Sequence, residues 1–185
     1  MHTSPRSANL LGALGVVLLD LLDDAAELAG GWTSATALLA VDGEAAGGSI
    51  DALARILGLS HSGTVRVVDR LVRDSLLERR RGADQRSAAL VLTPEGRRAA
   101  RRVRRRREAN LQSLRGLLTD DQQTALDEIA ERILSEVGAT EGAGRRVCRL
   151  CDLDACGRRR GSCPVAPRSR RPWTASAAAS TEREL

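Results

Sequence analysis

All four cysteines of this 185-residue chain lie in one short segment near its C-terminal end. Thiolates are soft ligands, and four of them can surround a zinc ion as a tetrahedron. An opening Cys-x2-Cys pair followed by two further cysteines is a spacing that zinc sites use. We therefore predict that the segment holds a metal ion, with zinc as the expected metal. The predicted ligands are Cys148, Cys151, Cys156 and Cys163.

Other thiol chemistries fit the same four residues. Pro164 directly follows Cys163, as in the Cys-Pro ending of some iron-sulfur ligand runs, so an iron-sulfur cluster is an alternative. A disulfide or a thiol redox switch is a second alternative, although stable structural disulfides are disfavoured in the cytoplasm. Free thiols without a function are the third. Arg149 and the run 158–160 would offset the negative charge of four thiolates on a dipositive ion.

A second set of polar residues falls on one face of a helix predicted from Ser60 to Asp74. Apolar or small residues recur there at helical spacing and would pack inward; they are Thr64, Val67, Val68 and Leu71. The opposite face carries donors suited to the major groove of DNA. We predict that His61, Ser62 and Arg66 read bases and that Ser60 and Arg70 contact phosphates. For His61, a merely solvated ring is an equal alternative.

A basic hairpin follows this helix. Two short strands are predicted at 77–81 and 88–92, and the turn between them contains glycine and aspartate. Arg86, at the tip, is predicted to lie in the flanking minor groove, and Asp84 to orient an arginine. Thr93 then caps a new helix whose first residue is a proline.

These residues resemble the MarR family of bacterial transcriptional regulators over residues 9–137. The matches are Leu59-Ser60, Arg66, Asp69-Arg70-Leu71, Leu77 to Arg79, Asp84-x-Arg86 and Leu92-Thr93-x-x-Gly96. The resemblance implies a mainly α winged helix-turn-helix fold with a two-stranded wing and long N- and C-terminal dimerisation helices. The chain departs from the family at Ser75, where a glycine is usual, and at 79–81, which is more basic.

The apolar run at 10–19 is predicted to begin a long helix that ends near Gly30-Gly31. The run is too short to cross a bilayer, and Asp20 and further acids follow it where a signal peptide would have small neutral residues. A helix that is apolar almost all round must be covered. The resemblance implies that it joins the last two helices in a homodimer interface.

The remaining elements divide the chain into one domain with extensions. Helices are predicted at 33–41, from a Ser49 cap to Leu57, from Pro94 to about Leu118, and from Thr119 to Val137. The predicted domains are a disordered N-terminus (1–8), a winged-helix domain (9–137), a linker (138–147), a cysteine-rich module (148–166) and a disordered tail (167–185). Within the domain, 33–96 would bind DNA, and 9–30 and 97–137 would dimerise.

Arginine supplies all 29 basic residues, and these residues are clustered. The eight arginines between Arg97 and Arg107 are interpreted as a solvated face, with phosphate contacts restricted to its first turns. Arg107 falls in the apolar stripe and is expected to snorkel or to pair with Asp23 or Asp24. The sequence has no glycine-rich phosphate loop, no serine elbow and no histidine beside a nucleophile, so no catalytic residues are predicted.

The sequence therefore predicts a cytoplasmic, homodimeric transcriptional regulator, and a repressor. It would bind double-stranded DNA at a pseudo-palindromic operator, would not contact a membrane, and would sense metal or redox state through the module. It identifies no effector ligand. The alternative is a protein-interaction adaptor, in which the cysteine module binds a partner and the winged helix is a docking scaffold.

Overall fold

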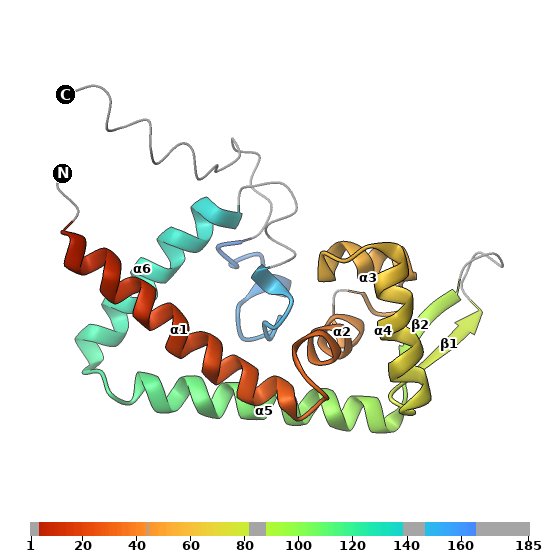
Figure 1. The fold of residues 1–185 in the computed structure, drawn as a ribbon. Coiled ribbons are helices and arrows are strands. Elements are labelled where there is room, and N and C mark those ends of the chain that lie inside the picture. The colour runs from red at the N-terminus through yellow and green to blue at the C-terminus, as the bar shows by residue number, and fades with distance from the viewer. Residues whose placement is uncertain (1–3, 44, 82–87, 139–146, 166–185) are drawn as a thin grey trace.

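Helices dominate the computed structural model, which describes residues 4–43, 45–81, 88–138 and 147–165 (Figure 1). The elements in chain order are α1 (Pro5–Glu27), α2 (Trp32–Asp42), α3 (Ile50–Leu57), α4 (His61–Arg73), β1 (Leu77–Arg81), β2 (Ala88–Leu92), α5 (Pro94–Arg115), α6 (Asp120–Gly138) and the short 3-10 helix η1 (Arg158–Arg160). This order confirms the predicted mainly α architecture with a two-stranded wing.

The core is built around α2. Every residue from 34 to 41 is buried, which fits a helix that is apolar or small on all sides. Leu38 of α2 is fully buried with Leu53 of α3, Leu71 of α4 and Leu90 of β2. Burying one leucine side chain contributes roughly 2 kcal/mol. The same cluster therefore packs α3, α4 and the wing against α2.

Local signals explain the helix-turn-helix. The Ser49 hydroxyl accepts a hydrogen bond from the backbone N–H of Ala52, and α3 begins there. Gly58 then adopts a left-handed conformation with φ of +68° and ends α3. The Ser60 hydroxyl accepts a hydrogen bond from the backbone N–H of Gly63 at 3.1 Å, so α4 begins at the next residue, His61.

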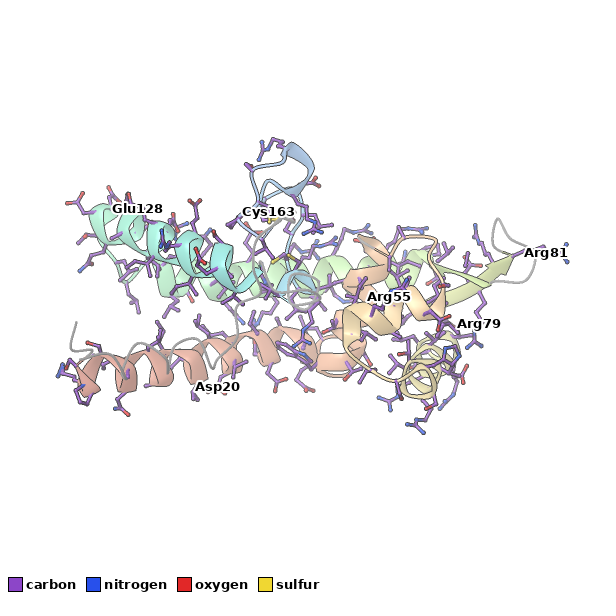
Figure 2. The ribbon with its side chains drawn as sticks, turned by 90° about the horizontal axis from the view of Figure 1, so that it is seen from above. Asp20, Arg55, Arg79, Arg81, Glu128 and Cys163 are labelled. Carbon is purple, nitrogen blue, oxygen red and sulfur yellow. The ribbon has the colours of Figure 1, made fainter. Side chains whose placement is uncertain are left out.

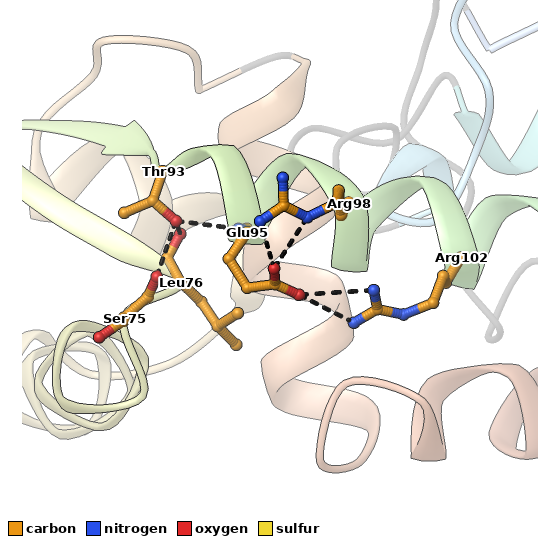
Figure 3. A network of polar contacts seen from close by, with 7 residues as sticks. Ser75, Leu76, Thr93, Glu95, Arg98 and Arg102 are labelled. Atoms are coloured by element: carbon orange, nitrogen blue, oxygen red, sulfur yellow. Dashed lines mark hydrogen bonds and ion pairs between the residues drawn. The ribbon is translucent and has the colours of Figure 1, made fainter.

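The wing is joined to the helices at both of its inner ends. β1 and β2 pair antiparallel with Leu77 opposite Leu92. Ser75 takes a left-handed φ of +57° between α4 and β1, as expected for a helix that ends there without glycine. Its carbonyl oxygen accepts a 2.7 Å hydrogen bond from the Thr93 hydroxyl, which in turn accepts one from the N–H of Gly96 (Figure 3).

Three long helices form the other end of the molecule. α1 packs along α5, and α6 folds back after the turn that ends α5 (Figure 1). α1 begins at Pro5 and not at residue 9, so the prediction of a disordered stretch up to residue 8 is wrong for Pro5 to Ala8; a proline is well suited to the first turn of a helix. None of the described helices is long and apolar enough to cross a membrane.

The pairing between α1 and α5 differs from the expectation by one residue. Arg106, and not Arg107, bonds Asp24, with Nε 2.7 Å from Oδ2 and Nη2 3.2 Å from Oδ1. Asn110 donates to the same carboxylate at 2.8 Å. Arg107 lies one position on, about 100° around the helix, and its Nε is buried with no hydrogen-bond partner among the described residues.

Candidate DNA-reading surface and cysteine module

The outward face of α4 carries the predicted DNA-contacting side chains. Thr64, Val68 and Leu71 are buried, whereas the residues predicted to touch DNA are exposed. The exposed set is Ser60, His61, Ser62, Arg66 and Arg70. The two-sided character of the helix is thus confirmed, and the contacts to DNA stay a prediction. We call residues 32–92, which hold this face and the wing, the DNA-reading part.

His61 is not a free ring at the start of α4. Its Nδ1 lies 2.6 Å from Oδ1 of Asp51 in the first turn of α3, and the two side chains are 64% and 68% exposed. This contact orients the ring, so Nε2 is the nitrogen available for a base or phosphate. Sequence reasoning missed Asp51, because ten residues separate the two partners and only the angle between α3 and α4 brings them together.

A second ion pair connects α4 to the wing. Nη2 of Arg79 in β1 lies 2.6 Å from Oδ1 of Asp69 in α4. Arg79 lies beside α4 and Arg81 lies farther along the wing, at the described end of β1 (Figure 2). The predicted tip residues Asp84 and Arg86 lie outside the described residues.

Several arginines of α5 pair with acids of this chain. Arg98 and Arg102 both reach the carboxylate of Glu95, and their hydrogen bonds and charges lower the pKa of Glu95 (Figure 3). Arg104 pairs with Asp42 at the end of α2. Arg98 and Arg102 are nonetheless exposed, as a solvated face requires, and the interpretation is wrong only for the partly buried Arg104, which ties α5 to α2.

The four thiols of the module are all free. Cys148 and Cys163 pack in one small cluster, with Cys156 against it. Cys148 and Cys163 are buried, at 4% and 5% exposure. Within the described residues no group of three or more His, Cys, Asp or Glu side chains has the arrangement of a metal site. The donor set suits a soft metal, but the four sulfurs would have to move to enclose one.

Basic side chains surround the sulfurs. The hydrogen bond from Cys148, together with the charges of Arg107 and Arg158, lowers the pKa of the Cys151 thiol to about 6. The hydrogen bond to Cys151 and burial raise the pKa of Cys148. Nη1 of Arg158 lies 3.7 Å from the Cys148 sulfur. Of the arginines expected near the sulfurs, Arg158 thus contributes positive charge, and Arg107 of α5, which was not predicted, contributes as well.

The module is not a separate unit behind a linker. Leu150 belongs to the same hydrophobic core as α2 and α3, and the segment 147–165 lies against α2 and α6 (Figure 1). The prediction of a module set apart from the winged-helix domain by a linker at 138–147 therefore does not match the packing. The predicted linker and tail fall mostly on residues 139–146 and 166–185, outside the described residues.

Several solved structures have a similar fold at low sequence identity. A MarR-family transcriptional regulator from Rhodococcus sp. RHA1 is 23% identical, with a TM-score of 0.57 over 72% of this chain and 95% of that one. The YusO protein from Bacillus subtilis is 21% identical, with a TM-score of 0.59 over 71% and 97%. S. aureus MepR bound to an oligodeoxyribonucleotide is 16% identical, with a TM-score of 0.56 over 72% and 98%.

No protein-family model matches the sequence, and no curated protein does. The structural similarities show that the chain has the winged-helix fold of MarR-family transcriptional regulators.

Proposed function

We propose that this chain is a DNA-binding transcriptional regulator that acts in the cytoplasm as a homodimeric repressor. The observation that carries the proposal is the orientation of α4. Its apolar side is buried in the core, and its basic and polar side is exposed. In this fold such a helix enters the major groove. S. aureus MepR, which has the same fold, is described in complex with an oligodeoxyribonucleotide.

The dimer is supported by the apolar surface of α1 and α6. Leu10, Leu11, Val16 and Leu19 of α1 are each more than half exposed, and so is Ile129 of α6. A surface of this kind on one chain is typical of a protein interface. A two-fold dimer would present two α4 helices to a pseudo-palindromic operator, one per half-site.

The test begins with a library of DNA duplexes that have a randomised centre, from which the purified dimer selects its preferred sequence. The selected duplex should be bound more tightly than a scrambled duplex of the same composition. Replacing Arg66 by Ala should reduce that preference, whereas Arg101→Ala, an exposed position on α5, should leave it unchanged. Binding without sequence preference would contradict the proposal and favour the alternative adaptor.

Arg86→Ala tests the wing. We expect this variant to lose about 1–3 kcal/mol of operator affinity and to flatten the salt dependence by roughly one unit, as for the loss of one phosphate contact. Equal affinity and equal salt slope would contradict a DNA contact by the wing tip.

We also propose that Cys148, Cys151, Cys156 and Cys163 together bind a zinc ion and that the module senses metal or redox state. The soft donor set and the basic surroundings support this, since bound zinc with four thiolates carries net negative charge. Each single Cys→Ser variant should then lose most of the metal. Two silent variants would indicate a disulfide, and visible absorption of protein purified without air would indicate an iron-sulfur cluster.

A further inference from the structure

The cysteine module lies between the DNA-reading part and α6, and it is packed against both (Figure 1). We propose that metal binding by the four cysteines ties the α2–α3 side of the molecule to α6, and so fixes the orientation of the DNA-reading part on the dimerisation helices. The proposal rests on the proposed function and specifies how that function is regulated.

One side of the module is inserted against α2 and α3. Leu150 is 8% exposed and belongs to the main hydrophobic core. Leu153 packs over Gly43 at the end of α2, where a Cβ would lie 3.1 Å from its Cδ1. The remaining space is a cavity of only about 10 Å³ lined by Leu39, Ala40, Ile56, Cys148, Arg149, Cys151 and Leu153. The module therefore already fills the contact with these helices.

Arg149 adds a polar contact on this side. Its guanidinium carbon lies 5.4 Å from the centre of the Trp32 ring at the start of α2. A cation over an aromatic face is attracted to it. The module thus holds α2 at both ends, at Trp32 through Arg149 and at Gly43 through Leu153.

The other side of the module is packed on the end of α6. A Cβ on Gly138 would lie 2.8 Å from Cγ1 of Val165, so the glycine permits a close approach. Val165 forms a small cluster with Cys163 and Cys148, and Leu134 of α6 covers it. Cys163 therefore lies on the α6 side, Cys151 lies on the α2–α3 side, and Cys148 contacts both.

A metal ion would connect these two sides. Zinc holds sulfur ligands at about 2.3 Å, so all four sulfurs must converge on one point. The four sulfurs must move to do this, since the described residues hold no ready-made metal group. Because the module that carries these sulfurs is packed against α2 and α3 on one side and against α6 on the other, drawing the sulfurs onto one point must shift or stiffen both contacts.

Stiffening matters because the two α4 helices of a dimer must match two half-sites at a fixed spacing. A dimer that already holds that spacing loses less conformational freedom on binding. The metal-bound form is therefore the form that binds the operator tightly, and metal loss weakens binding.

The experiment compares the full-length dimer loaded with zinc and the same protein stripped by a chelator, both reduced and without air. Zinc content and affinity for the selected duplex are measured for each. We expect at least a tenfold loss of affinity on stripping. Leu153→Ser should keep stoichiometric zinc but lose most of this dependence, because it loosens the contact with Gly43. Ala155→Ser, an exposed position in the same module, is the matched control.

Hydrogen exchange gives a readout that does not depend on DNA. Zinc should slow exchange of the Gly43 amide, which donates to the carbonyl of Ala40, and of the last amides of α6, but not of β1. If Leu153→Ser does not fold, Val165→Ser tests the α6 side in the same way.

The outcomes separate the proposals. Equal affinity with and without zinc, with sequence preference retained, would overturn the coupling and leave DNA binding standing. Full zinc dependence in both folded variants would also overturn it. No zinc in the parent protein would overturn the metal site, whereas no sequence preference in any form would contradict the proposed function itself.

Discussion

Arg79 in β1 and Asp69 in α4 form an ion pair that joins the wing to the candidate DNA-reading helix, with 2.6 Å between Nη2 and Oδ1. Their side chains are 37% and 47% exposed, so water screens the pair. Such pairs contribute at most about 1 kcal/mol to stability. The main effect of the Arg79–Asp69 pair is therefore to orient the wing relative to α4.

The first prediction concerns this orientation. Asp69→Arg should weaken binding to the selected duplex, and the swapped double variant Asp69→Arg with Arg79→Asp should recover much of the loss, with little change in melting temperature. Affinity and thermal unfolding are measured for the two single variants and the double variant. Glu78→Gln, which removes only a pair with Arg80 within the wing, is the control. Additive losses in the double variant would contradict the orienting role.

The stretch from Ser49 to Gly96 could be predicted from the sequence because its signals are local. Serine and threonine caps, a left-handed glycine after α3 and two short apolar runs set the ends of its helices and strands. The observed strands have the predicted bounds. These features need no knowledge of what the segment packs against.

Contacts between distant segments could not be predicted in this way. Whether Arg106 or Arg107 reaches Asp24 depends on the rotation of α5 against α1, and one residue changes the direction by about 100°. The insertion of Leu150 into the main core likewise depends on tertiary packing, because the spacing of the cysteines gives no sign of it. The sequence thus indicated which residues form the candidate site, but not what holds them.

Ser75→Gly should stabilise the protein. The serine has a φ of +57°, which costs a residue with a Cβ about 1 kcal/mol or more, while glycine adopts it freely. Glycine also gives the unfolded chain more conformational entropy, which offsets part of this gain. The free energy of unfolding should therefore rise by about 0.5 kcal/mol. Urea unfolding measures this. Ser113→Gly inside α5 should instead lower it by about 1 kcal/mol, and a loss in both variants would argue against strain at Ser75.

The contacts of the Asp24 carboxylate with α5 should stabilise the fold down to mildly acidic pH. Hydrogen bonds from Arg106 and Asn110 lower its pKa to about 2, from an ordinary value of 3.8. A carboxylate with a lowered pKa in the folded state contributes fully above its ordinary pKa and loses that contribution as the pH falls toward 2.

Asp24→Asn should therefore be less stable than the parent at pH 7, and the difference should shrink between about pH 4 and pH 2. Denaturant unfolding at a series of pH values tests this, with Asp23→Asn on the same turn as control. A constant difference at all pH values would mean that the charge of Asp24 does not matter.

Adding a single methyl group at Gly96 should strongly lower the free energy of unfolding. Gly96 is buried in the first turn of α5, and a Cβ there would overlap the backbone carbonyl oxygen of Leu76, which cannot rotate away as a side chain would. Gly96→Ala must therefore push α5 away from the segment between α4 and β1. We expect a loss of at least about 2 kcal/mol in the free energy of unfolding, as for an overpacked core.

The matched control is Gly116→Ala at the other end of α5. This glycine has a helical φ of −63°, and its nearest neighbour to an added Cβ is 3.5 Å away, an ordinary contact. The same substitution should there be neutral or stabilising by about 0.5 kcal/mol, because alanine restricts the unfolded chain. Urea unfolding and operator affinity are measured for both variants. The Gly96 N–H donates to the Thr93 hydroxyl, which donates to the Ser75 carbonyl, so Gly96→Ala should also lower operator affinity. A stable Gly96→Ala variant with normal affinity would show that this contact does not hold α5 and the wing together.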